Sequence, residues 1–550
     1  MYQYSDLLHD ILEKRGLKTE EEINSFLNPN YEKDLHDPFL MKDMDRACVK
    51  LFETIDSGEK TIIYADYDCD GIPGAVVLED LFKKIGYKNY EVYIPQRNSE
   101  GYGLNLSAIK QFTNKKVNLL ITIDLGITAI AEVAQATVDG IDVIITDHHI
   151  PHESLPRAYA ILNPKTDDYP DKRLCGAGVV FKFVQGFVKK YGEFYKINKG
   201  YEKWSLDMTG IATLSDQVPL LGENRVIAYF GMKVLRKSPR PGLQKILSKM
   251  NIDQKYLSED DVGFMLAPRL NAASRMDDPM RAYELLSVDD EVRGGMLADH
   301  LFKINDERKT IVTSIMREVN KNFEKRELKD VIVVGNPKWR IGVLGLIAGK
   351  MADNYKKPVF VWGRDENDVI KGSCRSDGSV SLVELMTATS ECFTEFGGHE
   401  LAGGFSVHNE KIYFLEEELS VAYQKVKREK VEDEVSYDVK VDLSAVNMKN
   451  WNELEKLAPF GMSNEKPVFL FEGVKVEKVK QFGKNGSGEH LEITFSDASD
   501  KKVKAVAFFS SLSSFKVPIE LNSRLNLLAT FDLSRWGGKT ELRLRIADIM

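Results

Sequence analysis

Four short apolar runs in the sequence end in acidic residues or histidines: TIIYADYDCDG (61–71), LLITIDLGI (119–127), VIITDHHIP (143–151) and IATLSDQVP (211–219). Their content of Ile, Val, Leu and Thr predicts that each run is a buried strand. In an open α/β sheet, ligands bind at the carboxyl ends of the strands. We therefore expect one sheet edge to collect the residues that follow these runs, namely Asp68, Asp70, Asp124, Asp147, His148, His149 and Asp216.

So many carboxylates repel one another unless cations neutralise them, which predicts a metal site with room for two ions. Asp68 and Asp70 alternate along the chain, so each can hold a different ion of a pair. Asp124 suits a bridging ligand beside them, although by itself it fits a helix N-cap equally well. Because adjacent histidines cannot face the same way on a strand, one is expected to bind metal and the other to donate to substrate. The carboxylate majority favours Mn²⁺ over Zn²⁺, with Mg²⁺ as the alternative.

The DYDCDG segment (66–71) also has the first half of an EF-hand calcium loop. That loop requires a bidentate Glu at its twelfth position, where this chain has Val77, and it follows a helix rather than a strand. The EF-hand is therefore rejected. Paired divalent ions lower the pKa of a bound water and clamp phosphate oxygens for in-line attack, so the residue set predicts phosphoester hydrolysis.

Two further segments have the composition of phosphate-binding elements. The glycines of FGGHELAGG (396–404) allow close backbone approach to an anion and present His399, and GSCRSDGS (372–379) offers Arg375 and Ser376. Arg97 stands in PQRNSEGYG. Taken singly, each also fits an ordinary glycine-rich turn or a solvated surface arginine.

The pattern of the chain predicts two α/β domains joined by a long helix, followed by a β-barrel. Alternating strands and helices begin after a helical lead-in at 1–45 and give way to a mainly helical stretch that ends near 285. A single apolar stripe through 286–327 predicts a connecting helix, and a fresh α/β pattern occupies 328–430. Five alternating segments in 435–550 predict short antiparallel strands, for which an OB-fold is the obvious candidate.

Composition restricts the class of protein. The 43% hydrophobic and 29% charged residues are those of an ordinary globular protein, and a net charge of −9 argues against a protein that coats polyanions nonspecifically. The five cysteines form no CxxC pair, which indicates a reducing compartment. With neither a signal peptide nor a long apolar run, we expect a cytoplasmic protein without membrane contact.

These motifs, in this order, resemble those of the DHH phosphoesterases: DYDCDG, the strand-end Asp124, DHH, and Asp216 in SDQVPL. GGHELAGG resembles the motif of their DHHA1 domain. Longer strings resemble the RecJ family of single-strand-specific 5′→3′ exonucleases: PQRNSEGYGL (95–104), LCGAGVVFK (174–182), PRLNAASRM (268–276), KWRIGVLGLIAGKM (338–351), GSCRS (372–376) and LAPFGMSNEKPVF (457–469). The resemblance runs from about residue 40 to the end of the chain.

The resemblance implies a DHH catalytic domain at 46–285, a DHHA1 domain at 328–430 and a nucleic-acid-binding OB-fold at 435–550. It implies that Asp70, Asp124, His148 and Asp216 ligate one ion, that Asp68 and Asp124 hold the other, and that His149 touches the scissile phosphate. Asp66 and Asp147 would be supporting residues. The strand would be bound by Arg97, Asn271, Arg275, Arg375, Ser376, Gly398 and His399. Tyr64 stands where some members of the superfamily carry a liganding histidine, so the ion at Asp68 is expected to be weakly held or to arrive with substrate.

The resemblance further implies digestion of single-stranded DNA to 5′-mononucleotides in DNA repair and recombination, by a monomer that works with a single-strand-binding protein and a helicase. Two other hypotheses stay open. A DHH phosphoesterase acting on short oligonucleotides or other small phosphoesters would need no barrel to grip a strand. A catalytically silent scaffold would be expected to have lost metal ligands, whereas this chain retains every aspartate and histidine of the set.

Overall fold

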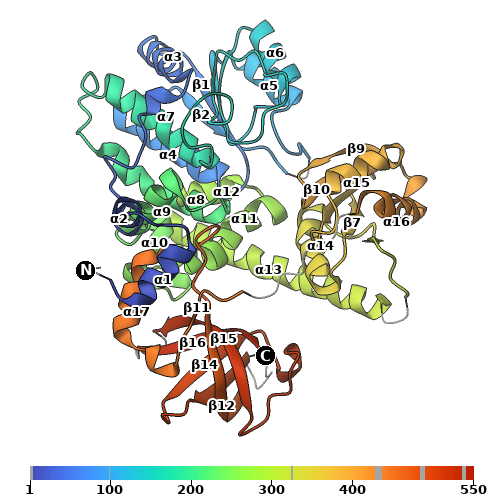
Figure 1. Ribbon diagram of the computed structural model, residues 1–550. Helices are drawn as coiled ribbons and strands as arrows, with labels where there is room; N and C mark the ends of the chain where they lie inside the picture. Colours follow the sequence, from blue (N-terminus) through green and yellow to red (C-terminus); the bar gives the residue numbers. More distant parts are fainter. Residues whose placement is uncertain (1–3, 98, 324–325, 428–435, 484–489, 536–539) are drawn as a thin grey trace. The chain divides into compact units, whose positions relative to one another are not determined.

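The structure, a computed structural model, describes residues 4–97, 99–323, 326–427, 436–483, 490–535 and 540–550 (Figure 1). Two compact units divide the chain. One unit takes in His36–Val218 and Phe230–Val431, and the other takes in Met1–Leu35, Pro219–Tyr229 and Glu432–Met550. Among the described residues, none of the helices combines the length and the hydrophobicity that a membrane crossing requires.

The larger unit begins with a parallel sheet of five strands in the order β2-β1-β3-β4-β5. The strands are β1 (Thr61–Ala65), β2 (Tyr90–Tyr93), β3 (Leu119–Ile123), β4 (Asp142–Thr146) and β5 (Ala160–Leu162). Every residue of β1 and β3 is buried, because helices cover both faces of the sheet. This two-sided burial explains why these strands read as continuous apolar runs.

Figure 1 shows the helices on the two faces of this sheet. They are α3 (Met44–Asp56), α4 (Gly71–Ile85) and α7 (Gly176–Tyr191) on one face, and α5 (Leu106–Asn114) and α6 (Ile130–Val138) on the other. The direction in which successive strands are added to the sheet reverses between β1 and β3. After β1 the chain adds β2 on one side, and it then returns to add β3, β4 and β5 on the other side. Such a reversal opens a crevice at the carboxyl ends of the two central strands, where ligands of α/β sheets bind.

A mainly helical region follows the parallel sheet. Its helices are α8 (Leu206–Ser215), α9 (Gly222–Leu235), α10 (Pro241–Lys249), α11 (Ala267–Met276), α12 (Met280–Ser287) and α13 (Glu291–Phe323). The long α13 packs against α10, α11 and α12, and also contacts α14 (Ile341–Tyr355) of the following sheet domain. Its buried residues include Leu301, Ile304 and Ile315 of the apolar stripe in the sequence, and Val312 in place of the Ile311 that the stripe predicted.

The second sheet has the order β6-β7-β8-β10-β9 and is mixed, with only the β6–β7 pair parallel. Its strands are β6 (Ile332–Gly335), β7 (Val359–Arg364), β8 (Ile370–Arg375), β9 (Phe393–Gly398) and β10 (Ala402–Val407). The remaining helices of this domain are α15 (Leu382–Ala388) and α16 (Leu415–Val426).

The smaller unit contains a closed five-stranded barrel. Its strands are β12 (Phe469–Phe482), β13 (His490–Ser496), β14 (Lys502–Phe508), β15 (Arg524–Ser534) and β16 (Glu541–Ile549). Strand β12 pairs with both β13 and β15, while β14 pairs in parallel with β16, which closes the barrel as in an OB-fold. The predicted fold class of two α/β domains, a long helix and an OB-like barrel is confirmed. The predicted start of the barrel domain at 435 lies outside the described residues.

The N-terminal helices α1 (Asp6–Lys14) and α2 (Glu20–Leu27) share a hydrophobic core with the barrel, α17 (Met448–Leu454) and the short β11 (Val439–Lys440). Leu8 and Ile11 are fully buried in this core. The segment 219–229 is held there by Arg225, which stacks over the ring of Phe26 and donates to the carbonyl of Leu457. The sequence predicted only a helical lead-in for the N-terminus, because nothing local shows that its apolar face belongs to a barrel more than 400 residues away.

Candidate metal centre

The register of the parallel sheet brings three strand ends to one level. Ala65 of β1 pairs with Ile123 of β3, which pairs with Thr146 of β4. The next residue along each strand is an aspartate, namely Asp66, Asp124 and Asp147. Asp124 has a left-handed backbone (φ 62°), a conformation that aspartate tolerates better than most residues. The strands therefore deliver these carboxylates side by side at the crevice.

The turn between β1 and α4 is fixed by its own backbone. The Oδ1 of Asp68 accepts hydrogen bonds from the amides of Asp70 (2.8 Å) and Gly71 (3.1 Å) and so caps the start of α4. A Cβ at position 71 would lie 2.5 Å from the carbonyl oxygen of Asp66, so only glycine fits there. The turn holds Asp66, Asp68 and Asp70 at the mouth of the crevice.

Asp216 reaches the same place from a helix. The sequence predicted a strand at 211–219, and this prediction is wrong because α8 (Leu206–Ser215) carries Asp216 at its carboxyl end. The helix is buried on nearly all sides, so its apolar residues show no 3.6-residue period. A short run of this kind cannot be assigned by periodicity.

The carboxylates converge on His148. Its Nε2 lies 3.1 Å from an oxygen of Asp124, 3.7 Å from Asp216 and 3.8 Å from Asp70. Three sets of ligand atoms lie within 4.8 Å of one another, namely Asp70–His148–Asp216, Asp66–Asp68–Asp124 and Asp124–His148–His149. The first and second sets share no residue, and Asp124 of the second set lies 3.1 Å from His148 of the first. The structure thus adds Asp66 to the carboxylates that the sequence assigned to the second ion.

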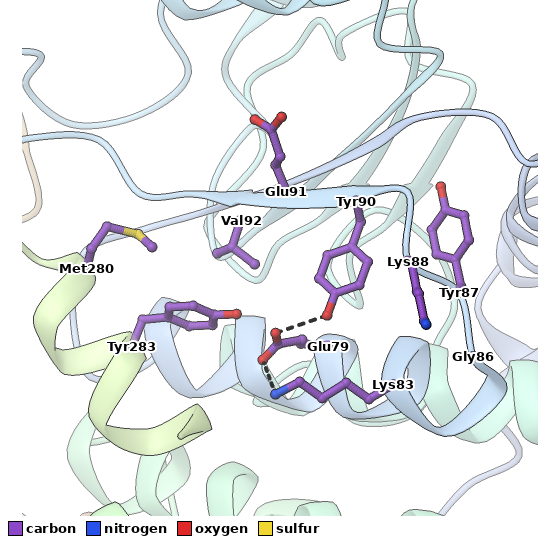
Figure 2. A pocket seen from close by; sticks show the side chains of 10 residues that line it. All are labelled: Glu79, Lys83, Gly86, Tyr87, Lys88, Tyr90, Glu91, Val92, Met280 and Tyr283. Carbon is purple, nitrogen blue, oxygen red and sulfur yellow. Dashed lines mark hydrogen bonds and ion pairs between the residues drawn. The ribbon is translucent and has the colours of Figure 1, made fainter. Parts of the chain in front are cut away.

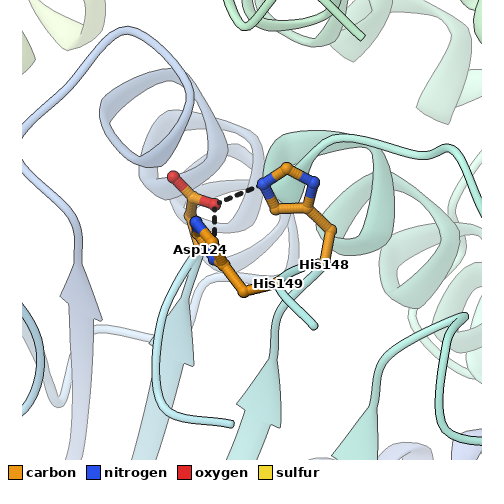
Figure 3. Close-up of side chains that lie close together, drawn as sticks. All are labelled: Asp124, His148 and His149. Atoms are coloured by element: carbon orange, nitrogen blue, oxygen red, sulfur yellow. Dashed lines mark ion pairs between the residues drawn. The ribbon is translucent and has the colours of Figure 1, made fainter. Parts of the chain in front are cut away.

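The two histidines approach Asp124 from different directions (Figure 3). The Nδ1 of His149 lies 3.8 Å from Asp124 and makes a hydrogen bond of 2.8 Å with Asp147. Asp147 also accepts hydrogen bonds from the amides of His148, His149 and Ile127. It therefore fixes the DHH turn, while His148 points into the carboxylate cluster.

The electrostatics of the cluster favour a cation. Burial, together with the charge of Asp68, raises the pKa of Asp70 to about 7. Burial and the charges of Asp70 and Asp68 raise the pKa of Asp216 to about 9, and burial and Asp70 raise the pKa of Asp124. Burial and the neighbouring His149 lower the pKa of His148 to about 3, so this imidazole is neutral and able to bind metal.

Asp147 and His149 behave as a pair. Burial favours the neutral forms of both, yet their mutual hydrogen bond outweighs burial, so the pKa of Asp147 lies below and that of His149 above the ordinary value. This hydrogen bond sets the His149 ring in place beside the carboxylate cluster.

The residues present fit divalent cations. The Oδ1 atoms of Asp66 and Asp124 are buried and have no hydrogen-bond partner among the described residues. Buried carboxylate oxygens left without donors are costly, and a cation satisfies them. A donor set of carboxylates with one or two imidazoles suits Mn²⁺ or Mg²⁺.

Three arginines near this cluster, Arg97, Arg275 and Arg375, form no ion pair with a carboxylate of the described residues. Burial, then the charges of Arg97, Arg308 and Arg375, lower the pKa of Arg275 to about 9. Arg97 stacks over the ring of Tyr67, and Arg275 and Arg375 donate to backbone carbonyls. Cations gathered in this way favour an anionic ligand.

The other residues assigned to strand binding are placed as follows. His399 lies with its ring centroid 6.4 Å from that of His149, and the two rings are nearly parallel. Gly398 precedes it with φ 144°, a conformation restricted to glycine. The hydroxyl of Ser376 donates to the carbonyl of Val380. Asn271 has a buried Oδ1 with no hydrogen-bond partner among the described residues.

Two residues at the site were missed by the sequence reasoning. The hydroxyl of Tyr102 lies 3.4 Å from Nε2 of His149. Lys165 donates through Nζ to the carbonyl of His148, and its charge reaches Asp216. Tyr102 stands in the PQRNSEGYGL string that supplied Arg97, so that motif could have identified it. Nothing local marks Lys165, which follows β5 in a loop.

A pocket of ≈540 Å³ lies at the opposite, amino end of β2 (Figure 2). The carboxylate at its floor, Glu79, pairs with Lys83 at 3.1 Å and accepts a hydrogen bond from Tyr90. The second carboxylate of the lining, Glu91, pairs with Lys60 and Lys115, so each carboxylate here already has a lysine beside it. The carboxyl ends of the strands are therefore the better candidate for a metal centre.

Comparison with known proteins places the chain in a family. A model of the DHH family, N-terminal domain, matches residues 60–213, one of the DHHA1 domain matches 328–430, and one of the RecJ OB domain matches 437–548. The single-stranded-DNA-specific exonuclease RecJ of Bacillus subtilis is 33% identical over 98% of this chain and 67% of its own length. The chain belongs to the RecJ family.

Solved structures of RecJ proteins share the fold. RecJ of Thermus thermophilus in complex with Mn²⁺ has a TM-score of 0.83 at 22% identity, with 100% of this chain and 76% of that chain covered. An exonuclease RecJ bound to manganese has a TM-score of 0.63 at 26% identity, with 71% and 97% covered. The RecJ fold thus accounts for the domain order described above.

Proposed function

We propose that this chain is a metal-dependent exonuclease that hydrolyses the phosphodiester bonds of single-stranded DNA. The observation that carries the proposal is the convergence of five buried or half-buried aspartates and His148 at one sheet edge, beside arginines that lack carboxylate partners. Membership of the RecJ family supports the choice of substrate, because the Bacillus subtilis relative is named as a single-stranded-DNA-specific exonuclease.

Asp70, Asp124, His148 and Asp216 would hold one Mn²⁺ or Mg²⁺, and Asp66, Asp68 and Asp124 the other. Bound ions of this kind supply an activated water and neutralise charge on the phosphoryl oxygens. The chain holds these ligands rigidly: the amides of Gly176 and Ala177, at the start of α7, donate to the two oxygens of Asp70 at 2.6 and 2.7 Å.

The remaining polar groups would bind and orient the strand. Asp147 fixes the ring of His149 beside the cluster, where it can donate a hydrogen bond to a phosphate oxygen. Arg97, Arg275 and Arg375 would neutralise phosphates, with His399 at the same side of the site. Asn271, Ser376 and Gly398 complete the strand-binding set that we propose.

The resemblance to the RecJ family also supports digestion in the 5′→3′ direction with release of 5′-mononucleotides, in DNA repair and recombination. We propose that the chain acts as a monomer in the cytoplasm, alongside a single-strand-binding protein and a helicase, since its substrate has to be unpaired. The five cysteines, all buried and free, suit a reducing compartment.

The test is digestion of one DNA sequence as a single strand and as a duplex, labelled at either end, with Mn²⁺, Mg²⁺ or chelator. We expect metal-dependent release of mononucleotides from the 5′ end of the single strand alone. Equal digestion of the duplex, or full activity in chelator, would contradict the proposal. Faster turnover of a dinucleotide than of a long strand would instead favour a small-substrate phosphoesterase.

A further inference from the structure

Helices α11 and α13 pack together, and each carries buried polar atoms that have no hydrogen-bond partner among the described residues. Four such atoms are the Nε of Arg269, Oδ1 of Asn271, Oδ1 of Asn305 and Nε of Arg308. Asn305 is only 1% exposed and Arg269 only 8% exposed. Buried polar groups in folded proteins nearly always have hydrogen-bond partners, so a group of four without them calls for an explanation.

Two guanidinium groups dominate the charge at this contact, and the charge of Asp306 acts on one of them, that of Arg269. Arg269 stacks over the ring of Phe302 at 4.5 Å and donates one hydrogen bond to the carbonyl of Met265 at 2.5 Å. Arg308 makes no hydrogen bond or ion pair with any described residue. Burial, then the charge of Arg269, lower the pKa of Arg308, which indicates that the two guanidinium groups lie near each other. The nearby Asp306 is exposed and pairs with Lys309 instead.

This cationic contact continues toward the proposed active site. The charge of Arg308 contributes to lowering the pKa of Arg275, together with Arg97 and Arg375. Asn271 and Arg275 lie one turn apart on α11, and Asn305 and Arg308 lie three residues apart on α13, on the face that packs against α11. The guanidinium groups of Arg275 and Arg308 therefore lie near enough for their charges to act on each other, which links the strand-binding arginines to α13.

We infer that Arg269 and Arg308, with the side-chain amide of Asn305, form a further phosphate-binding subsite for the DNA strand. The inference rests on the proposed function and extends it. A guanidinium fork matches two phosphate oxygens, and an amide turned by 180° presents its NH₂ group to the same anion. A phosphate bound here would supply acceptors to the Nε atoms of Arg269 and Arg308, which have none among the described residues. The phosphate is either the one at the 5′ end of the strand or one within its backbone.

The experiment compares Arg308→Gln with a matched control, Arg317→Gln, which changes an exposed arginine on the same helix. KM is measured for a long single strand with Mn²⁺ at several salt concentrations, on strands with a 5′-phosphate and with a 5′-hydroxyl. We expect Arg308→Gln to raise KM about tenfold, the effect of losing one charge-assisted hydrogen-bonded contact. The slope of log KM against log salt should fall by about 0.7, the value for one phosphate contact on a single strand.

A penalty confined to 5′-phosphorylated strands would assign the subsite to the terminal phosphate, and an equal penalty on both strands would assign it to an internal one. Arg308→Lys keeps the charge but loses the fork, so it should keep the wild-type salt slope with a smaller rise in KM. An unchanged slope in Arg308→Gln, or an equal change in Arg317→Gln, overturns the inference.

Two readouts separate this inference from the proposed function. If the wild type digests the strand and Arg308→Gln keeps its salt slope, the subsite alone is wrong. Anisotropy of a labelled strand bound in chelator measures the same slope without any digestion, so the subsite is tested even if the nuclease activity is absent. Thermal unfolding of each variant shows whether a loss of binding reflects a loss of fold.

Discussion

Replacing Asp124 by Asn tests two effects of the carboxylate cluster at once. The cluster is needed for metal-dependent digestion, and the repulsion within it destabilises the metal-free fold. Asparagine is nearly isosteric with aspartate and tolerates the left-handed backbone that position 124 requires (φ 62°). The substitution removes one negative charge from the centre of the carboxylate cluster while leaving the turn intact. We expect it to abolish metal-dependent digestion and, in chelator, to make the larger unit more stable than the wild type.

The magnitude follows from the spacing of the carboxylates. Oxygens of Asp66, Asp68 and Asp124 lie within 4.8 Å of one another. At that separation two full charges repel by about 3 kcal/mol when the effective dielectric constant is about 20. Since proton sharing relieves part of this repulsion, we expect a gain of about 1–3 kcal/mol when the cluster is ionised, which amounts to several degrees in Tm.

The gain should depend on pH. A carboxyl whose pKa is raised on folding stabilises the fold below its unfolded pKa and loses that contribution as pH rises through the folded value. For Asp70, raised from 3.8 to about 7, the loss spans pH 4 to 7. For Asp216, raised to about 9, it continues to pH 9. The metal-free wild type should therefore lose stability from pH 4 to 9, and Asp124→Asn should lose less of it.

The assay is thermal unfolding at pH 5, 7 and 9 in chelator and in Mn²⁺, with strand digestion measured on the same samples. Mn²⁺ should stabilise the wild type more at pH 9 than at pH 5, because metal competes with protons for the carboxylates. Asp207→Asn serves as a control of opposite sign: this buried aspartate pairs with Arg240 at 2.8 Å, so its replacement should destabilise the protein. A lower Tm for metal-free Asp124→Asn at pH 9, or digestion at the wild-type rate, would refute the reasoning.

Three further changes test other parts of the structure. Gly176→Ala places a Cβ 2.5 Å from the Cβ of Asp124, so it should displace this carboxylate and weaken Mn²⁺ affinity at least tenfold in a titration. Gly178→Ala is the control: its Cβ would make no contact under 3.5 Å, so Mn²⁺ affinity should be unchanged. Leu8→Ala empties a fully buried site in the barrel core and should cost about 2–5 kcal/mol in the unfolding of the smaller unit, with nuclease activity retained. Lys165→Ala removes a positive charge beside the cluster, so the pKa of Asp216 should rise further, while Mn²⁺ affinity should increase several-fold because the cation no longer meets a like charge.

Local sequence was sufficient for the elements whose signal lies within a few residues. The runs before Asp66, Asp124 and Asp147 are strands because burial on both faces demands continuous apolar residues, and parallel strands place their carboxyl ends together. The barrel strands and the long α13 could also be predicted from the sequence. Alternation of apolar and polar residues, and an apolar stripe with helical spacing, are each contained within a single segment.

Only the tertiary structure decided the rest. It showed that Asp216 follows a helix, that Asp66 lies with Asp68 and Asp124 in a group able to hold a cation, and that Lys165 and Tyr102 border the site. It also united α1 and α2 with the barrel, and it buried guanidinium nitrogens of α11 and α13 that have no hydrogen-bond partner among the described residues. Periodicity records whether a side chain is buried, but the identity of its neighbour depends on how distant segments pack. That information is carried by the whole chain rather than by any one stretch of it.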